Sequence, residues 1–582
     1  MSNKVNQHDG QQVKLKDFSR ECRPAVSPLQ YSYYHGVCPT PLSGKTIGQM
    51  LNRAADQGAN HVIFKVPDYN QEITLGDLLR RTRAAAKGLI AMGLQKGDVV
   101  MLTGMADMES IVLYYAAVYI GLVLFQPCMR YPLDRYLPKA MQVKPSVLFV
   151  GPEVLPVINE ELEKIWKSSE TDRPKPLKDI ICTKNNQHSF SQYSEFLKQG
   201  ETVSDGTLND ISSRVGMDDI AFILTTSGSS GEAKLVCQSH CYAVNCAKFT
   251  NARRNPYQKS DIIGIRNPTT DDIQFFLSVT QAVYNWQEIS MIIMSSKVDF
   301  YQDDITCLLQ CIQTYRMTWY SGYPFELVKM LDNPSLQNYD ISSLRGVVVT
   351  AQMITSDLKQ RLKQHFPDTS NAYGSSEGMV SMISAALSSE TQKSESVGYP
   401  FPHTQVKIVG DNNEILPIGK AGEICTRGWF CFTKYLNDPE MTSKAKGETG
   451  WLHLGDIGIM DATGHIELIG RKEECVVFKH IGDKVYPSLI LDTANKHEAV
   501  KEAKVVGIQD NHIGHKVCLF VQLNPDAELT EKQLEEYFNK ELLFLECPTK
   551  YFILDVMPRV GSRGKVHIQR LKEIAIDRLE RR

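Results

Sequence analysis

The sequence predicts an α/β protein: a large N-terminal domain of doubly covered sheets plus a β-rich subdomain, followed by a small α+β C-terminal domain. Helical patterns alternate with short apolar runs over most of the chain, the runs become shorter and glycine-punctuated from about residue 400, and a separate mixed pattern closes the chain. Strands that alternate with helices favour parallel sheets covered on both faces. We therefore expect a variable lead at 1–28, a large domain at 29–470, a hinge at 471–474 and a small domain at 475–582.

The first clear element is a helix over Asp77–Met92, whose apolar residues recur on one side and which Gly93 ends. Further along, Ile111–Phe125 is an apolar run of 15 residues. This run is shorter than the roughly 18–20 residues that span a bilayer. We expect it to form a buried helix that leads into a strand. Shorter apolar runs predict buried strands at Val99–Leu102, Val147–Val150, Ile220–Leu224, Ile289–Met294 and Leu344–Thr350.

The C-terminal third differs from the rest of the chain in its pattern of predicted elements. Its first part predicts short strands at Gln405–Val409, Gly422–Arg427, Gly458–Met460 and His465–Ile469. Its second part predicts strands at Val505–Ile508 and Val517–Leu523 and helices at Glu531–Leu543 and Ile568–Leu579. The polar run 470–474 lies between the two parts, as expected of an exposed joint.

The composition excludes several classes of protein. The chain has 64 basic and 67 acidic residues, so its net charge of −3 gives no reason to expect a nucleic-acid partner. Hydrophobic residues make up 42%, which excludes a disordered chain. The 14 cysteines contain no CxxC pair, which favours free thiols in a reducing compartment. Residues 1–28 lack the apolar stretch of a secretory signal, and 580–582 is not a peroxisomal tripeptide. We expect a cytoplasmic protein, and mitochondrial import stays open.

The stretch Thr225–His240 carries the most chemical information. It follows the buried run Ala221–Leu224, so we expect a strand that leads into a flexible loop. Glycines let a backbone approach an anion, hydroxyls donate to it, and Lys234 adds a positive charge. A polyphosphate fits this loop, although the Walker A spacing is absent. A Ser/Gly-rich surface turn is the plain alternative. A zinc site at Cys237, His240, Cys241 and Cys246 is disfavoured, because no second ligand pair has finger-like spacing.

Later motifs strengthen the phosphate interpretation. Together with the loop they resemble the signatures of the adenylate-forming superfamily, which includes acyl-CoA synthetases, coumarate-type ligases, beetle luciferases and peptide-synthetase adenylation domains. The motifs occur in the family's order, as Asn371–Glu377, Gly422–Gly428, Trp451–Asp456, Gly470-Arg471, Gly482–Pro487 and Gly564-Lys565. Near the start, Tyr31–Gly48 resembles the entry segment of the medium-chain branch called acyl-CoA synthetase family member 2. The resemblance covers roughly residues 30–575.

The resemblance implies an enzyme that uses ATP, Mg²⁺, coenzyme A and a small carboxylic acid. It assigns Lys565, Lys234 and Glu377 as catalytic residues, with Glu377 also binding Mg²⁺. The nucleotide-binding residues that it implies are Thr226, Ser227, Gly228, Ser229, Ser230, Gly231, Lys234, Tyr373, Asp456, Arg471 and Lys565. Tyr373 is expected against the adenine and Asp456 on the ribose. In the family the small domain is mobile and swings about a hinge carboxylate, here Glu473.

Several positions depart from the family pattern. The phosphate loop has Ala233 and Leu235 around its lysine, and Leu454 replaces a threonine before Gly-Asp. The segment Arg266–Asp272 lacks the usual gating histidine and carries two acids. The segment Cys475–Ile481 is longer than the pattern. This last change falls on an element that serves thioester formation, the second step of the family's reaction, more than adenylation, the first step.

We interpret the chain as an ATP-dependent carboxylate–CoA ligase that forms an acyl adenylate and then a thioester, with a medium-chain fatty acid expected from the branch resemblance. One alternative is a luciferase-type enzyme that adenylates a luciferin carboxylate and oxidises it with O₂. Another is a degenerate, non-catalytic binder of a nucleotide or acyl ligand. The sequence leaves the acid and the oligomeric state open, and it predicts neither a nucleic-acid partner nor a transmembrane segment.

Overall fold

The computed structural model describes most of the chain from residue 27 onward. Residues outside this description are 1–26, 105, 128–136, 138–139, 156–157, 159, 161, 163–176, 185–189, 227–233, 253–256, 267–271, 295–304, 350–355, 385–395, 473–475, 478–483, 486, 511–513, 543–546, 561–564 and 581–582. Within the described ranges, none of the helices has the length and apolar character needed to cross a bilayer.

Two eight-stranded sheets form the body of the large domain. The first has the strand order β20-β10-β9-β5-β4-β6-β7-β8. Its strands are β4 (Val99–Thr103), β5 (Val123–Phe125), β6 (Val147–Val150), β7 (Asp179–Cys182), β8 (Ser191–Gln192), β9 (Ile220–Thr225), β10 (Leu235–Ser239) and β20 (Lys434–Tyr435). The pairs from β8 to β9 are parallel, and β10 and β20 add an antiparallel edge.

The second sheet has the order β16-β15-β14-β13-β11-β12-β2-β3. Its strands are β2 (Val62–Val66), β3 (Gln71–Thr74), β11 (Asp261–Arg266), β12 (Ile289–Met294), β13 (Trp319–Gly322), β14 (Gly346–Val349), β15 (Asp368–Ser375) and β16 (Gly378–Ser384). The central pairs are parallel, and the two outermost pairs are antiparallel. Parallel sheets bind ligands at the carboxyl ends of their strands. A ligand site is therefore expected at the ends of β11, β13, β14 and β15.

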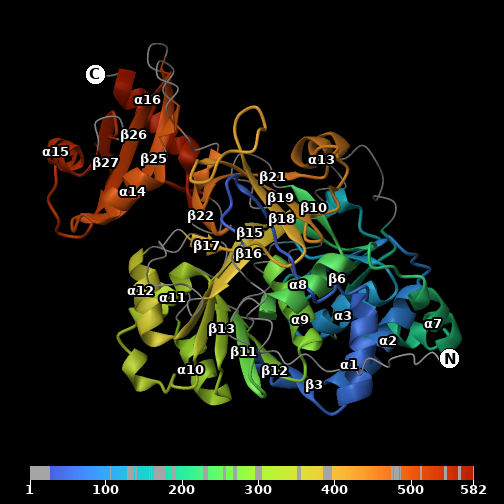
Figure 1. Ribbon diagram of the computed structural model, residues 1–582. Helices are drawn as coiled ribbons and strands as arrows, with labels where there is room; N and C mark the ends of the chain where they lie inside the picture. The colour runs from blue at the N-terminus through green and yellow to red at the C-terminus, as the bar shows by residue number, and fades with distance from the viewer. Residues whose placement is uncertain are drawn as a thin grey trace, which may run out of the picture.

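Helices cover both sheets and fill the space between them (Figure 1). They are α1 (Ile47–Gly58), α2 (Leu75–Ala91), α3 (Met108–Tyr119), α6 (Tyr193–Gly200), α7 (Asp205–Ser213), α8 (His240–Ala252), α9 (Asp272–Tyr284), α10 (Thr306–Tyr315), α11 (Pro324–Leu331), α12 (Ser356–His365) and α13 (Pro439–Lys446). Alternate strand residues enter different cores: Phe222 and Leu224 face the central core, and Ile223 faces the opposite side of the sheet. Both faces of the sheet are therefore buried.

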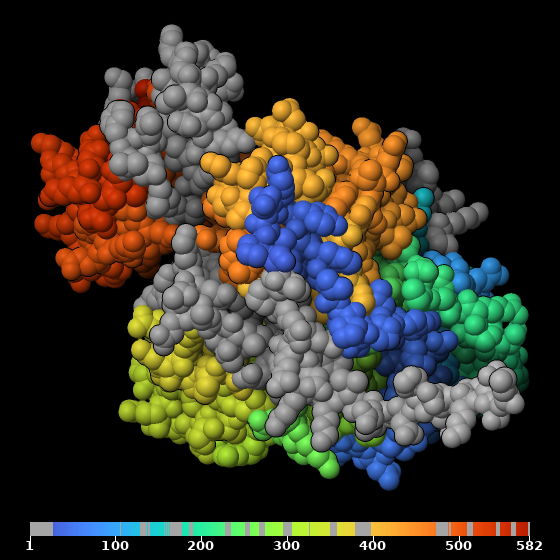
Figure 2. All heavy atoms as spheres, viewed as in Figure 1, coloured from blue at the N-terminus to red at the C-terminus, as the bar shows by residue number. Residues whose placement is uncertain are grey.

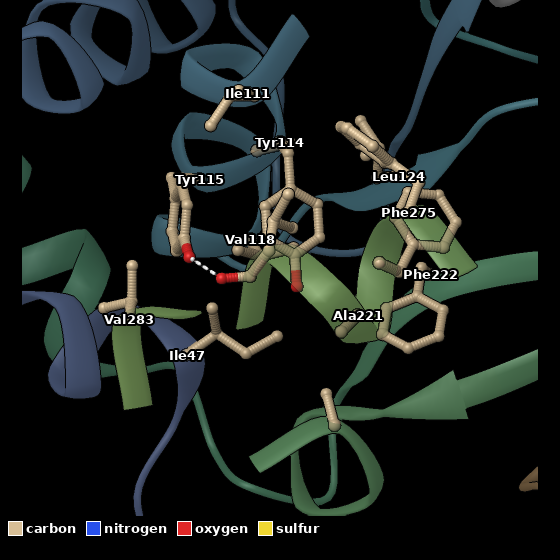
Figure 3. Packing of buried hydrophobic residues seen from close by; sticks show 14 of the residues in the cluster. Ile47, Ile111, Tyr114, Tyr115, Val118, Leu124, Ala221, Phe222, Phe275 and Val283 are labelled. Atoms are coloured by element: carbon tan, nitrogen blue, oxygen red, sulfur yellow. Dashed lines mark hydrogen bonds between the residues drawn. The ribbon is translucent and has the colours of Figure 1, made fainter. Parts of the chain in front are cut away.

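The central core is dominated by aromatic side chains where α3 meets α9. Tyr114 stacks on Phe276, and Tyr115 donates a hydrogen bond of 2.8 Å to the carbonyl of Val279 (Figure 3). The hydroxyl of Tyr114 lies 2.5 Å from that of Thr280. Buried phenols need such partners, because an unpaired hydroxyl in an apolar core costs about 1–3 kcal/mol. These bonds fix the position of α9, one face of which lines a cavity described below.

A six-stranded antiparallel sheet forms the β-rich part, in the order β1-β18-β19-β21-β22-β17. Its strands are β1 (Tyr33–His35), β17 (Ser396–Gly398), β18 (Thr404–Val409), β19 (Gly422–Gly428), β21 (Leu452–Met460) and β22 (Ile466–Arg471). The first described residues, from 27 onward, cross the surface of this part and join its edge, since β1 pairs with β18 (Figure 2).

The C-terminal domain stands to one side of the large domain in Figure 1, and α14 contacts β22. Its main sheet contains β25 (Val500–Asp510), β26 (Gly514–Leu523) and β27 (Lys550–Ile553). Two short ribbons pair β23 (Val476–Val477) with β24 (Lys484–Val485) and β28 (Arg559–Val560) with β29 (Lys565–Val566). The helices are α14 (Pro487–Asn495), α15 (Glu531–Glu541) and α16 (Ile568–Glu580).

The predicted α/β class is confirmed. The run Ile111–Phe125 forms α3 followed by β5, as expected of a buried helix leading into a strand. The predicted strands Val147–Val150 and Ile289–Met294 match β6 and β12 in both bounds. The predicted helix Asp77–Met92 begins earlier, at Leu75, because Thr74 caps it by accepting from the amide of Asp77.

Candidate active site

The loop predicted to bind phosphate leaves the first sheet and returns to it at one point. The amide of Thr226, just after β9, donates to the carbonyl of Lys234 at 2.9 Å. The amide of Lys234 donates in return to the Thr226 hydroxyl oxygen, also at 2.9 Å. This reciprocal pair closes the loop at its base, so two of the predicted site residues are in contact. Ser227, Gly228, Ser229, Ser230 and Gly231 lie outside the described residues.

Glu377 lies at the tip of the hairpin formed by β15 and β16. Ser375 pairs with Gly378, so Ser376 and Glu377 form a two-residue turn. The amide of Phe432 donates to the Glu377 carbonyl at 2.7 Å, and the side-chain amide of Gln238 donates to the Ser376 carbonyl at 2.8 Å. These bonds join the hairpin tip to β10 and to the segment before β20.

Tyr435, which the sequence analysis did not select, connects two predicted catalytic residues. Its hydroxyl donates to Oε1 of Glu377 at 2.8 Å, and Nζ of Lys234 lies 5.3 Å from the centre of its ring. Burial and the nearby Glu377 carboxylate raise the pKa of Tyr435, so its phenol stays protonated and remains a donor. Nothing in the linear spacing identifies this tyrosine, because β20 reaches the site only through its pairing with β10.

Asp456, Tyr373 and Arg471 form a second group. The Tyr373 hydroxyl donates to Oδ2 of Asp456 at 2.6 Å, and Nη1 of Arg471 donates to Oδ1 at 2.7 Å. The exposed fraction of Asp456 is only 8%. Burial and the Asp456 carboxylate hold the pKa of Tyr373 well above its ordinary value, so this phenol is also a permanent donor. Each carboxylate oxygen still has capacity for a second bond.

The backbone explains why this group assembles. Asp456 on β21 lies directly opposite Arg471 on β22 in the antiparallel register. Gly455, the preceding residue, has φ +70°, which other residues adopt at a cost. Tyr373 and Glu377 are only four positions apart, so the β15–β16 hairpin carries one member of each group. The structure thus brings Lys234, Glu377, Tyr373, Asp456 and Arg471 to one region.

A third ionic group lies beside the linker to the small domain. Oε2 of Glu423 accepts from Nζ of Lys472 at 2.7 Å and lies 3.2 Å from Nδ1 of His453. Burial opposes ionisation of Glu423, but its hydrogen bonds with His453 and Lys472 outweigh that effect and lower its pKa to about 2. Sequence reasoning assigned no role to this group. Its members come from β19, β21 and the residue after β22.

The remaining predicted residues are less fully described. Lys565 begins β29 and pairs with Val560, and its side chain lies outside the described residues, as does Glu473. Cys237, Cys241 and Cys246 are buried free thiols, and burial raises the pKa of Cys237 to about 11. In the parts of the chain that the structure describes, no group of three or more His, Cys, Asp or Glu side chains could hold a metal ion.

Two departures from the family pattern can be located. Leu454 packs against apolar residues of two cores, and its carbonyl accepts from Nη1 of Arg471 at 3.3 Å. Arg266 ends β11 in a buried position, with its Nη1 3.8 Å from Glu326. The main chain of Leu454 thus still helps to hold Arg471, although no hydroxyl is present there.

Two helix-covered sheets and a third antiparallel sheet carry the site residues, and a separate C-terminal domain follows them. This is the architecture of an adenylate-forming enzyme. The chain belongs to the AMP-binding enzyme family, which it matches over residues 51–436; residues 492–564 match the AMP-binding enzyme C-terminal domain. The fold resembles that of the anthranilate CoA ligase AuaEII in complex with anthranoyl-AMP, with a TM-score of 0.76, 18% identity and coverage of 92% of this chain and 98% of that chain. It also resembles ATP-bound MatB from Rhodopseudomonas palustris, with a TM-score of 0.73, 20% identity and coverage of 91% and 99%.

Curated relatives match nearly the whole chain. The acyl-CoA ligase sidI of Aspergillus fumigatus is 26% identical, over 98% of this chain and 98% of its own. The mitochondrial medium-chain acyl-CoA ligase ACSF2 of Bos taurus is 25% identical, over 93% of this chain and 89% of its own. The predicted membership of the adenylate-forming superfamily is confirmed.

Proposed function

We propose that the protein is an ATP-dependent carboxylate–CoA ligase. A substrate carboxylate oxygen attacks the α-phosphorus of ATP, the bond to the bridging oxygen breaks, and pyrophosphate leaves. The thiol of coenzyme A then attacks the acyl carbon, a thioester forms, and AMP leaves. The observation that carries the proposal is the Asp456 carboxylate of β21, which accepts from Arg471 of β22 and from Tyr373 of the β15–β16 hairpin, whose turn also presents Glu377. The ligase names of both curated relatives support the second step.

Different residues of this chain would bind the nucleoside and the phosphates of ATP. Asp456 would accept from the ribose hydroxyls, and Tyr373 would contact the adenine. Thr226 and Lys234, with the loop between them, would hold the departing phosphates. Lys565 would neutralise charge at the α-phosphate, where preorganised positive charge lowers the barrier most. Nζ of Lys234 lies 5.3 Å from the centre of the Tyr435 ring, and an ammonium over a ring keeps N–H groups that can donate to an anion.

Mg²⁺ fits the donor set around Glu377. A hard cation of this kind is commonly held by one or two carboxylates plus substrate phosphates. Glu377 provides one carboxylate, and the bond from Tyr435 to Oε1 fixes its orientation. When bound, the ion would neutralise phosphate charge. Tyr435 contributes orientation, since its phenol donates to Oε1 of this carboxylate.

We further propose the hinge at 471–474 and a cytoplasmic location. Arg471 is the last residue of β22 and is tied to Asp456. If the small domain rotates about Glu473 between the two half-reactions, Glu473→Pro should spare pyrophosphate release and suppress thioester formation. Equal loss of both activities would contradict the hinge. Cell fractionation tests the location, which the mitochondrial name of the Bos taurus relative places in question.

The experiment that tests the function uses purified protein, ATP, Mg²⁺ and a panel of aliphatic and aromatic acids, with and without coenzyme A. Pyrophosphate and acyl-CoA are both measured. Acyl-CoA formation is expected. Pyrophosphate without thioester would favour another fate for the adenylate, such as luciferase-type oxidation, which light emission with O₂ would reveal. ATP binding without any turnover would favour a degenerate binder.

A further inference from the structure

A cavity of ≈ 40 Å³ lies between the second sheet and the helices that cover it. Its lining comes from α8, α9, β11, β13 and β14 and from the segment between α8 and β11. Ile265, Ser321 and Val348 are register neighbours across three parallel strands, so they form one row on the same face of the sheet. The cavity is thus built on the regular part of the fold.

This cavity lies close to the candidate active site. Val348 pairs with Ser370 of β15, and Tyr373 follows three positions later on the same strand. At about 3.3 Å per strand residue, that spacing is roughly 10 Å along the strand. The parallel strands run toward the edge where Tyr373 and Glu377 lie, which is where a doubly covered sheet binds its ligands. A substrate whose carboxylate meets the nucleotide at this edge can extend its other end into the cavity.

The lining residues that the structure describes are apolar or polar, and all of them are uncharged. Ile263, Ile265, Val348 and three aromatic residues provide the apolar part. The polar part comprises Thr250, Ser278, Gln281 and Ser321. Among the residues that the structure describes, no charged side chain belongs to this lining, and Arg266 at the end of β11 is paired with Glu326. An anionic tail would therefore lose its hydration without gaining a cation, which is strongly unfavourable.

The polar groups on α9 follow the helix repeat. Gln274, Ser278 and Gln281 are spaced by four and three residues, so they share one face, while Phe275, Phe276 and Val279 enter the central core. Nε2 of Gln274 donates to the Ser321 carbonyl at 3.1 Å. Nε2 of Gln281 is buried and has no hydrogen-bond partner among the residues that the structure describes. A buried donor without an acceptor costs about 1–3 kcal/mol.

The size of the cavity limits what can satisfy this donor. About 10–15 Å³ of such volume holds one water, so the cavity has room for roughly three non-hydrogen atoms. We propose that it receives the distal end of the acyl substrate, and that Gln281 selects a carboxylic acid bearing a neutral oxygen acceptor, a hydroxyl or a carbonyl, near that end. This inference rests on the proposed function. It replaces a plain medium-chain fatty acid by a short hydroxy- or oxo-acid as the preferred substrate class.

Matched acids test the proposal directly. Pyrophosphate release is measured with hexanoate, 6-hydroxyhexanoate, 5-oxohexanoate and the dianion adipate. We expect kcat/KM for the better of the two neutral oxygenated acids to exceed that for hexanoate by about tenfold, the range of one hydrogen bond to a buried donor, and adipate to be the poorest substrate. Which of the two acids is preferred shows whether the acceptor for Gln281 is a hydroxyl or a carbonyl oxygen.

Gln281→Leu keeps the volume of the side chain similar and removes the donor. The ratio of kcat/KM between the oxygenated acid and hexanoate should fall toward one. Gln310→Leu, the same change at an exposed position of α10, is the matched control and should keep the wild-type ratio. Substrate-induced shifts in Tm provide a second readout that requires no turnover. The oxygenated acid should raise the Tm of wild type more than hexanoate does, and Gln281→Leu should remove this difference.

The outcomes separate this inference from the proposed function. Wild type that prefers hexanoate, or a Gln281→Leu variant that loses activity on both acids equally, would overturn the inference while the ligase function stands. Absence of pyrophosphate release with every acid would contradict the ligase function. In that case an equal Tm shift from hexanoate and its oxygenated partners would overturn the inference as well.

Discussion

Arg471 and Asp456 face each other across β21 and β22, and Nη1 of Arg471 lies 2.7 Å from Oδ1 of Asp456. Asp456 is nearly buried, whereas Arg471 is the last residue of the large-domain sheet before the segment that leads to the small domain. The carboxylate expected to hold the ribose is therefore hydrogen-bonded to Arg471, where the linker to the small domain begins. A ligand that bonds to Asp456 shares that carboxylate with Arg471.

Replacing Asp456 by Asn tests this arrangement. The variant keeps the shape but removes the negative charge and one acceptor, so Tyr373 and Arg471 both lose part of their partner. We expect ATP to bind about 10-fold to 100-fold more weakly, since a charged hydrogen bond contributes about 1.5–3 kcal/mol. Isothermal titration calorimetry measures the change. Asp210→Asn, at an exposed ion pair of α7, is the control, and equal affinities of all three proteins would contradict the assignment.

Tyr435→Phe tests whether the tyrosine orients Glu377. Phenylalanine keeps the ring near Lys234 and removes only the hydroxyl that donates to Glu377. We expect about a tenfold fall in kcat and an increase in the Mg²⁺ concentration needed for half-maximal pyrophosphate release. Tyr399→Phe, which removes a hydroxyl near exposed Thr463, is the matched control. A fall in kcat with an unchanged Mg²⁺ dependence would show that Tyr435 does not act by orienting Glu377 for Mg²⁺.

Lys565→Ala tests the catalytic lysine that the motif assigns. If its ammonium neutralises charge only as the α-phosphate reacts, adenylation should fall by at least about 100-fold while ATP affinity changes little. Single-turnover formation of the acyl adenylate measures this step apart from product release. Lys501→Ala, an exposed position on β25, is the control. A parallel loss of ATP affinity and rate would instead indicate a binding role.

His240 gives a prediction about pH. It is fully buried, its Nδ1 accepts from the amide of Ile47 at 3.2 Å, and burial lowers its pKa from 6.5 to about 4. Below pH 6.5 the unfolded chain takes up a proton that the folded chain refuses until about pH 4, so stability falls as pH decreases through this window. The loss attributable to His240 is about 3 kcal/mol.

The free energy of unfolding, measured in urea between pH 4 and pH 7.5, checks this dependence. His240→Gln should reduce stability at neutral pH and give a shallower decline below pH 6.5, because the variant has no group to protonate. His365→Gln, at an exposed position on α12, should keep the wild-type slope. A wild-type slope in His240→Gln would mean that other groups cause the acid sensitivity.

Much of the fold could be predicted because hydrophobic periodicity is a local signal. Ile111–Phe125 shows this: its length and glycine favour a helix followed by a strand, and α3 and β5 have those positions. Element ends were less predictable, since caps such as Thr74 depend on side-chain bonds as well as on periodicity. The motif residues Lys234, Glu377, Tyr373, Asp456 and Arg471 could be selected because the short motifs that contain them resemble, in the same order, those of the adenylate-forming superfamily.

Contacts between distant strands could not be predicted in this way. Tyr435 lies 58 positions from Glu377, and the Glu423 carboxylate contacts Lys472 over 49 positions. Gln281 belongs to a helix whose 3.6-residue repeat predicts a polar face, but only the packing of α9 against the second sheet turns that face toward a cavity. The sequence by itself determined the fold class and the chemistry of the motifs, because both reside in local patterns. The tertiary structure decided which side chains meet, because strand pairing and helix packing bring together segments that are far apart in the sequence.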